Sequence, residues 1–194
     1  MPGIPKEKIG QFFKKLAEKA PEAKGTIYVT GGAALILYGI PRFTEDINIE
    51  IPVGLNEEDI LSTAKEVGIL VEFGVDIERW GMTALAHYRQ NAVLHQKFGG
   101  LTVKIVDPLN IIAPKLARFI ERDIEDAVIL IQKFKILRQD LLSHLEKVYE
   151  RSPASLEKGQ LRGNIVRFLK EYQKTLWGKE EFLPEWLNAA STRK

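Results

Sequence analysis

A short run of strict alternation constrains the fold more than any other feature of this sequence. From residue 46 to residue 51 the chain reads DINIEI, with isoleucine at every second position and Asp46, Asn48 and Glu50 between them. Side chains of a β-strand point alternately to its two faces, so this pattern predicts a strand with one apolar and one polar face. The isoleucines then enter a core that other elements must cover.

The segments around this strand predict an α+β fold. Thr26–Thr30 is a second short, β-rich strand, and Gly31-Gly32 follows it directly and opens a helical stretch to residue 38. Residues 6–19 show helical periodicity and are expected to pack on the sheet. Asn56 and Gly68 are a good N-cap and C-cap for a further helix. Residues 69–89 predict a mixture of strand and loop.

The remainder of the chain predicts a hairpin and then helices only. Residues 90–98 and 101–106 are expected to pair as strands around the two-residue turn Gly99-Gly100. Helices are expected at 108–120, 122–135, 138–150 and 155–176, and Pro114 should kink or interrupt the first. We therefore expect a small mixed sheet of four or five strands with packed helices in residues 1–107, and a C-terminal helical bundle in residues 108–194 that packs on this core.

Composition excludes several classes of protein. Hydrophobic residues make up 45% of the chain and charged residues 28%, which is typical of a folded globular domain. The chain has no cysteine, so a disulfide framework, a Cys-based zinc site and a thiol nucleophile are excluded. No apolar run approaches the roughly 20 residues of a membrane span, and we expect a cytoplasmic protein with no membrane partner. Trp177, Trp186 and their apolar neighbours are expected to cap the core, and homo-oligomerisation through them stays open.

The stretch from residue 28 to residue 51, YVTGGAALILYGIPRFTEDINIEI, carries the chemistry. At Gly31-Gly32 no side chain blocks the approach of an anion to the backbone N–H groups, and the helix that follows favours negative charge at its start. The polar face of the next strand presents oxygen ligands that divalent ions prefer. A phosphate-binding turn beside metal-binding side chains is typical of sites that catalyse phosphoryl or nucleotidyl transfer.

The order of these features resembles the nucleotidyltransferase fold of the DNA polymerase beta superfamily. The resemblance is strongest to its small prokaryotic branch, which includes minimal nucleotidyltransferases and the toxins of abortive-infection toxin–antitoxin systems. The family pattern is a Gly-Gly or Gly-Ser turn, a helix, an Arg-x-Thr approach and an Asp-x-Asp strand. Its counterparts here are Gly31-Gly32, the helix that follows, Arg42-Phe43-Thr44, and Asp46-Ile47-Asn48. Downstream, Lys115 precedes an Arg122-Asp123 stretch, as in that branch.

The resemblance implies an activity and a set of site residues. It implies transfer of a nucleotidyl group from an NTP such as ATP to an RNA or protein acceptor, with Mg²⁺ as cofactor and a toxin or antitoxin as a possible partner. Asp46, Asn48 and Glu50 are the candidate catalytic residues, with Asp46 and Asn48 as metal ligands. Nucleotide phosphates would be held by Gly31, Gly32, Arg42, Thr44 and Lys115.

One departure from the family pattern affects the metal. The second aspartate of the family is Asn48 here, and an amide oxygen brings no charge to an ion. Glu50 shares the face of Asp46 but lies about 13 Å from it along the strand. The resemblance implies a third carboxylate on a neighbouring strand, for which residues 101–106 are expected, yet the only charge there is Lys104. Lys104 could instead pair with Asp46 or Glu50 in a metal-independent site. Asp76 and Asp107 stay open as acids that folding could bring to the site, and their spacing favours neither.

Each of these residues also has a purely structural alternative. The diglycine could serve only close packing of helix on strand, and the polar face of the alternating strand could be its solvated side. Lys115 could bind phosphate or lie along its own helix, and Asp123 and Asp126 are expected to bond structurally to Arg122 or Lys115. An active nucleotidyltransferase and a non-catalytic binding module or toxin–antitoxin component therefore both stay open.

Overall fold

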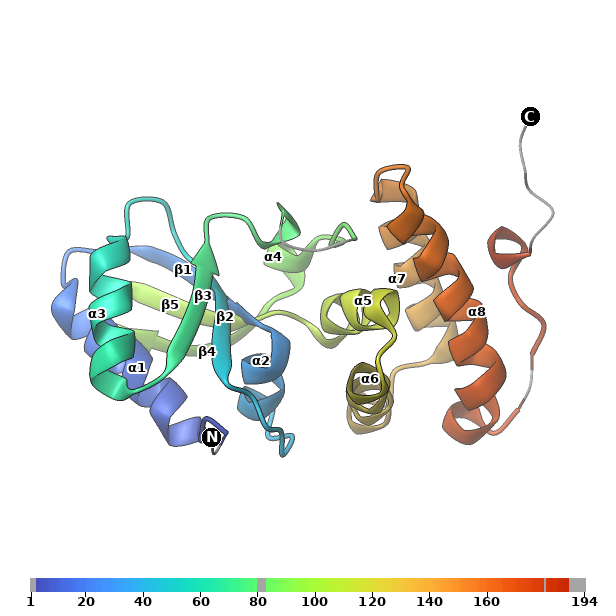
Figure 1. The fold of residues 1–194 in the computed structure, drawn as a ribbon, viewed down its shortest axis with the longest axis horizontal. Coiled ribbons are helices and arrows are strands. Elements are labelled where there is room, and N and C mark those ends of the chain that lie inside the picture. Colours follow the sequence, from blue (N-terminus) through green and yellow to red (C-terminus); the bar gives the residue numbers. More distant parts are fainter. Residues whose placement is uncertain (1–2, 80–82, 180, 189–194) are drawn as a thin grey trace. The chain divides into compact units, whose positions relative to one another are not determined.

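The chain divides into two compact units, which we describe separately (Figure 1). The computed structural model describes residues 3–79, 83–179 and 181–188. The first unit comprises residues 1–77 and 87–107, and the second comprises 78–86 and 108–194. Residues 78–86 thus join the helical unit although sheet strands flank them on both sides in the sequence. That the helices of residues 108–194 pack on the core stays a prediction.

The first unit is built on a mixed sheet of five strands in the order β3-β2-β1-β5-β4. The strands are β1 (Gly25–Thr30), β2 (Asp46–Glu50), β3 (Leu70–Gly74), β4 (Val93–Phe98) and β5 (Leu101–Ile105). β1 lies antiparallel to β2 and parallel to β5, whereas β2 lies parallel to β3. The prediction of an α+β fold with a mixed sheet of four or five strands is confirmed.

Register gives the sheet one apolar and one polar face. In the β1–β2 pair Val29 lies opposite Ile49, and both are fully buried. The alternate positions form the other face, where Thr30 lies opposite Asn48 and Tyr28 opposite Glu50. The alternation of residues 46–51 therefore places the isoleucines in the core, as predicted.

Helices cover the apolar face of this sheet. They are α1 (Lys6–Lys19), α2 (Gly31–Leu37) and α3 (Glu57–Val67). The buried side of α1 contributes Phe13, whose ring lies 6.2 Å from that of Phe98 on β4, so α1 packs on the sheet as predicted. In α3 the Asn56 side chain accepts a hydrogen bond from the Glu58 N–H, and Gly68 ends the helix in the left-handed conformation, so both predicted caps are confirmed.

The stretch from residue 69 to residue 92 differs in part from the expectation. β3 is followed by a 3₁₀ turn (Ile77–Arg79) and a short helix α4 (Tyr88–Asn91). Residues 90 and 91, expected to begin a strand, belong to this helix instead. The hairpin after it is confirmed: β4 and β5 are antiparallel around Gly99-Gly100, with a register irregularity between Leu94 and Gln96.

The second unit is helical, with α5 (Pro108–Arg118), α6 (Glu121–Phe134), α7 (Arg138–Arg151) and α8 (Leu156–Trp177). α5 runs through Pro114 without interruption, and the alternative of a kink there stays a prediction. The C-terminal aromatic residues pack in part as expected. The Trp177 indole donates to the Ile136 carbonyl oxygen, and the Trp186 ring lies 5.6 Å from that of Tyr149.

None of the described helices has both the length and the apolar character that crossing a membrane requires.

Candidate functional site

The predicted site residues of the first unit gather at one edge of the sheet. β1 and β5 end at this edge and β2 begins there, because β2 is antiparallel to β1 and pairs Asn48 with Thr30. Gly31 follows Thr30 directly, so the diglycine turn continues from β1 past the first residues of β2. The chain thus brings together Gly31, Gly32, Asp46 and Asn48.

Close contacts show how tightly the turn fits against its neighbours. Gly31 has φ +64°, and a Cβ atom on it would lie 3.4 Å from Asn48 Nδ2. A Cβ atom on Gly32 would lie 2.6 Å from Thr44 Oγ1 and 2.8 Å from Thr44 Cβ, closer than atoms can approach. Glycine at position 32 is therefore required by the close approach of Thr44.

Thr44 joins the turn to the start of β2. Its side chain is buried against Gly32, and its hydroxyl lies 3.2 Å from both Asp46 Oδ1 and the Asp46 carbonyl oxygen, to which it donates. The main-chain N–H of Ile4 donates to the Thr44 carbonyl oxygen at 2.9 Å, which fixes the approach to the strand. Asp46 and Asn48 stay partly exposed beside the turn. Arg42 is also partly exposed, in the loop before Thr44.

Glu50 has a different environment from the other two polar residues of β2. Its side chain is 5% exposed. One oxygen, Oε2, accepts a hydrogen bond from the Ile77 N–H at 3.0 Å and a second from the Tyr88 hydroxyl, and Oε1 accepts from Arg89 Nε at 2.7 Å. Burial, followed by the hydrogen bond to Glu50, raises the pKa of Tyr88. Both carboxylate oxygens of Glu50 are therefore already engaged within the protein.

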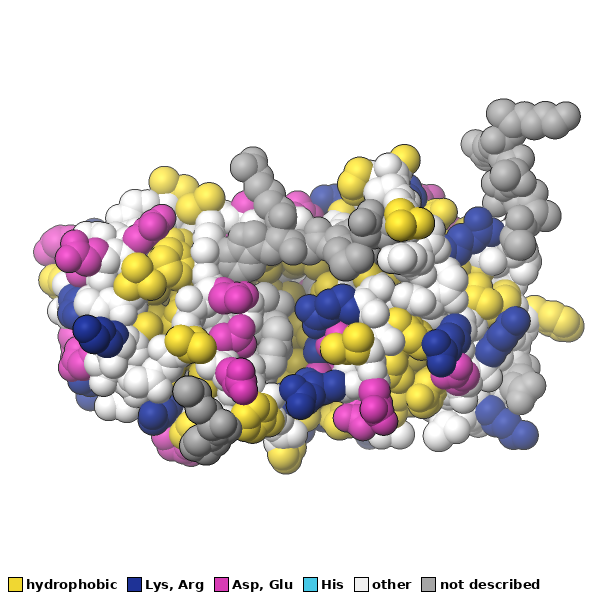
Figure 2. All heavy atoms as spheres, in the orientation of Figure 1, with side chains coloured by type: hydrophobic (Ala, Val, Ile, Leu, Met, Phe, Trp, Pro, Cys, Tyr) yellow, Lys and Arg dark blue, Asp and Glu magenta, His cyan; other side chains and the backbone are white. Residues whose placement is uncertain are grey.

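A further carboxylate was expected on residues 101–106, but these form β5, which does not lie next to β2. β5 lies beside β1, whereas the outer neighbour of β2 is β3. Among the described residues no ion pair joins Lys104 to Asp46 or Glu50. In the β2–β3 pair Glu72 lies opposite Asn48, and Glu72 is exposed. Figure 2 shows a row of acidic side chains where Figure 1 draws β2 and β3.

Sequence reasoning missed Glu72, because the segment that contains it was predicted only as a mixture of strand and loop. Its sequence, LVEFG, places one acid between two apolar residues. That alternation indicates a strand but does not reveal which strand it pairs with. Asp107 is a second acid near this edge, since it follows the end of β5; it is buried and contributes to a raised pKa of Tyr38, after burial itself.

The donor set beside the turn fits one weakly bound divalent ion better than a cluster of ions. It consists of the Asp46 carboxylate and the Asn48 amide, with Glu72 as the nearest acid in register. Nowhere in residues 3–79, 83–179 and 181–188 do three or more His, Asp or Glu residues form a group that could hold a metal. Hard cations are bound tightly where several carboxylates converge, so affinity here should be low.

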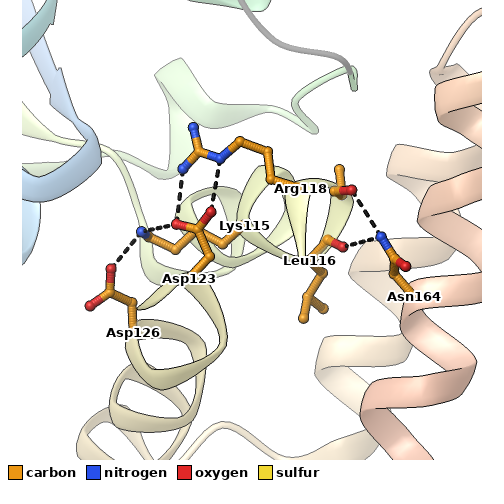
Figure 3. A network of polar contacts seen from close by, with 7 residues as sticks. Lys115, Leu116, Arg118, Asp123, Asp126 and Asn164 are labelled. Atoms are coloured by element: carbon orange, nitrogen blue, oxygen red, sulfur yellow. Dashed lines mark hydrogen bonds and ion pairs between the residues drawn. The ribbon is translucent and has the colours of Figure 1, made fainter. Parts of the chain in front are cut away.

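Lys115 belongs to the second unit and is buried within it (Figure 3). Its ammonium lies 2.9 Å from Asp123 Oδ1 and 2.6 Å from Asp126 Oδ2. Arg118 donates two hydrogen bonds to the same Asp123 carboxylate, at 2.8 and 2.9 Å. Burial opposes ionisation of Asp123, but the hydrogen bonds from Arg118 and Lys115 outweigh it and lower its pKa. The structural alternative expected for Asp123 and Asp126 is thus observed, with Lys115 as their partner.

The Asn164 side chain supports this network from α8. It donates to the carbonyl oxygens of Leu116 and Ala117 at 3.0 and 2.9 Å, and so caps the end of α5 (Figure 3). A side chain of a third helix of the same unit thus binds the last turn of α5, the helix that carries Lys115 and Arg118.

Comparison with known proteins finds a weak structural similarity and no match in sequence. No protein family matches the chain, and no curated protein matches it. Among solved structures the chain is similar to an antigenic nucleotidyltransferase-like protein from Paracoccidioides brasiliensis, with 18% sequence identity over 94% of this chain and 97% of that chain and a TM-score of 0.41. At this level of similarity the chemistry of the site has to be judged from its own contacts.

Proposed function

We propose that this chain is a nucleotidyltransferase-like protein that binds a nucleoside triphosphate at the Gly31-Gly32 turn. In this proposal it transfers a nucleotidyl group to a hydroxyl of an RNA or protein acceptor. The acceptor oxygen bonds to the α-phosphorus, the bond from that phosphorus to the β-phosphate oxygen breaks, and pyrophosphate leaves while the hydroxyl proton passes to solvent.

The observation that carries the proposal is that the Gly31-Gly32 turn lies directly beside Asp46 and Asn48, whose side chains stay partly exposed. The N–H groups of this turn would bind the phosphates of the nucleotide. The oxygen atoms of Asp46 and Asn48 would bind the cation that accompanies those phosphates.

Each residue has a defined task in this proposal. The N–H groups of the turn bind phosphate oxygens. Thr44 fills the space that a side chain at position 32 would take, so Gly32 itself serves the packing of the turn. α2 has only seven residues, so its dipole adds little beyond these N–H groups. Thr44 orients the Asp46 carboxylate through its hydroxyl. Asp46 and Asn48 would hold a Mg²⁺ ion, which supplies neutralisation of phosphate charge when bound.

Two residues of the predicted site have no task here. Glu50 is saturated by three donors of its own unit, and Lys115 is bound by two carboxylates. Using either for nucleotide would break these bonds and leave buried polar groups unpaired. We propose that both are structural.

A second function is supported by the poor donor set. With Asn48 in place of a carboxylate, the chain would bind nucleotide or RNA without catalysing transfer, as a binding module or a member of a toxin–antitoxin pair. Calorimetry with ATP, with and without Mg²⁺, separates the two functions. Strong dependence of affinity on Mg²⁺ supports the enzyme, and metal-independent binding supports the module.

Transfer itself is tested with each of the four labelled NTPs, Mg²⁺ or Mn²⁺, and tRNA or candidate proteins as acceptors. Asp46→Ala should abolish transfer, because it removes the carboxylate nearest the turn. The matched control is Asp59→Ala on α3, an acid of the same unit away from this edge of the sheet. Equal NTP binding and equal transfer by the wild type and Asp46→Ala would refute this site.

A further inference from the structure

The contacts of Glu50 have a topological consequence. The chain leaves the first unit after Ile77 and returns at His87, so residues 78–86 are an excursion into the second unit. Glu50 binds the last residue before the excursion, through the Ile77 N–H, and two residues just after it, Tyr88 and Arg89. One buried carboxylate therefore holds both ends of the excursion on the first unit.

Further contacts reinforce this arrangement around Glu50. The Arg89 guanidinium lies 3.7 Å from Asp76 Oδ1 and 5.0 Å from the centre of the Tyr88 ring. The Tyr88 ring in turn packs against Tyr28 of β1, with 5.9 Å between ring centres. The residues on either side of the excursion are thus bound to each other and to the sheet as well as to Glu50.

Residues 84–86 of the excursion are hydrogen-bonded within the second unit. The Asn110 side chain accepts from the Ala86 N–H at 2.8 Å and donates to the Ala86 carbonyl oxygen at 3.0 Å. Ser152 Oγ accepts from the Ala84 N–H at 3.0 Å, and Glu78 Oε1 accepts from the Leu85 N–H at 3.2 Å. The main-chain groups of residues 84–86 are therefore fixed by side chains of the second unit.

Backbone strain marks the point where the chain returns. His87 has φ +55°, in the left-handed region that residues other than glycine rarely occupy. Such a conformation persists only where surrounding contacts hold it. His87 stands directly between Ala86, bound by Asn110, and Tyr88, bound by Glu50. The contacts on its two sides supply that constraint.

We propose that Glu50 is a clasp that fixes both ends of the excursion on the first unit, through the Ile77 N–H before it and through Tyr88 and Arg89 after it. This inference goes beyond the nucleotide site and does not depend on it. A carboxylate suits the task because it accepts several hydrogen bonds at once, and here it accepts from three different residues. Without it the Ile77 N–H and the buried Tyr88 hydroxyl lose their acceptor.

Hydrogen exchange of single amides tests the clasp in the 194-residue chain. The Ile77 amide and the amides of Gln90, Asn91 and Ala92, which donate within α4, report on the two ends of the excursion. In Glu50→Ala we expect the Ile77 amide to exchange at least about tenfold faster than in the wild type, the factor that corresponds to 1.4 kcal/mol. Amides in the β1–β5 pair should keep their rates. Unchanged exchange at Ile77 in a folded variant would overturn the clasp.

The matched control is Glu72→Ala, which removes an exposed acid from the neighbouring strand on the same face. It should leave exchange at Ile77 unchanged. If Glu50→Ala does not fold, Glu50→Gln and Tyr88→Phe take its place, because each removes only part of the network. Both are expected to accelerate exchange at Ile77 by a smaller factor than Glu50→Ala, and wild-type rates in both variants would refute the proposal.

Hydrogen exchange uses no nucleotide, so failure here leaves the proposed function untouched, and failure of nucleotide binding leaves the clasp untouched.

Discussion

The two ends of strand β2 carry similar side chains in very different environments. Asp46 and Asn48, at its beginning, are partly exposed beside the diglycine turn. Glu50, at its end and on the same face, is buried and accepts hydrogen bonds from three residues. A strand of five residues thus has one end with ligand atoms left accessible and one end that is closed by the protein itself. The difference comes from segments distant in sequence, since α4 covers only the second end.

The largest effect is expected from the closed polar cluster of the second unit. Lys115→Met removes the cation between Asp123 and Asp126 and leaves two buried carboxylates without it. Loss of one partner from a buried ion pair costs about 3–5 kcal/mol, so the free energy of unfolding in urea should fall by that amount. Lys170→Met, exposed on α8, is the control and should change it by less than about 0.5 kcal/mol. If Lys115 served nucleotide instead, affinity would fall while stability persisted.

The closed end of β2 should behave in the same way. Glu50→Ala leaves the Ile77 N–H and the Tyr88 hydroxyl without an acceptor, and each unsatisfied buried donor costs about 1–3 kcal/mol. We expect a loss of about 3 kcal/mol in the free energy of unfolding, measured by urea denaturation. A loss no greater than that of Glu72→Ala would show that the two ends of the strand do not differ.

Gly32→Ala tests the turn at the open end. The new Cβ would collide with Thr44, at 2.6 Å from its hydroxyl oxygen, and should displace the side chain that orients Asp46. Overpacking of this kind costs about 1–3 kcal/mol in stability, and we expect nucleotide binding in calorimetry to be lost as well. The control is Gly10→Ala in α1, where a Cβ meets no atom within 4 Å. Wild-type affinity in Gly32→Ala would contradict the proposed site.

Asp46→Ala should affect ligand binding far more than folding. It removes one hydrogen bond from Thr44 and should lower stability by about 1 kcal/mol or less. A stability loss equal to that of Glu50→Ala would abolish the contrast between the open and closed ends. Urea denaturation of both variants under identical conditions measures the difference directly.

The smallest effect is expected from Asn48→Asp. The added charge beside Asp46 should raise the affinity for Mg²⁺ about tenfold, which corresponds to 1.4 kcal/mol, because charge count sets the affinity of oxygen ligands for hard cations. Stability without metal should change by less than about 0.5 kcal/mol. Calorimetric titration with Mg²⁺ measures the gain, and no gain would mean that the two side chains do not share an ion.

The sequence predicts what is decided locally. The caps of α3, the alternation of β2 and the glycine hairpin before β5 each depend on a few adjacent residues, and all three are observed. The start of β4 was placed too early because residues 88–91 form a helix whose Tyr88 and Arg89 bind Glu50. No local pattern contains that information, since Glu50 lies 38 and 39 residues away from them.

The candidate site was predictable only in outline. The order of turn, threonine and alternating strand indicated the open end correctly as a group of neighbours. Which strand pairs with β2, and whether Glu50 and Lys115 are accessible, depends on sheet order and helix packing across the chain. Glu72 was missed for that reason, because its place beside Asn48 is set by the pairing of β3 with β2.

The excursion of residues 78–86 determines how the chain could be dissected. A polypeptide ending at residue 107 would contain the whole sheet, but Ala84 and Ala86 would lose their hydrogen-bond partners Ser152 and Asn110. Leu85 and Ala86, both buried in the intact protein, would then be left without those neighbours. No single cut separates the two units cleanly, so gene truncation at this border should yield poorly soluble products, whereas replacing residues 78–86 by a short glycine-rich bridge should rescue the sheet.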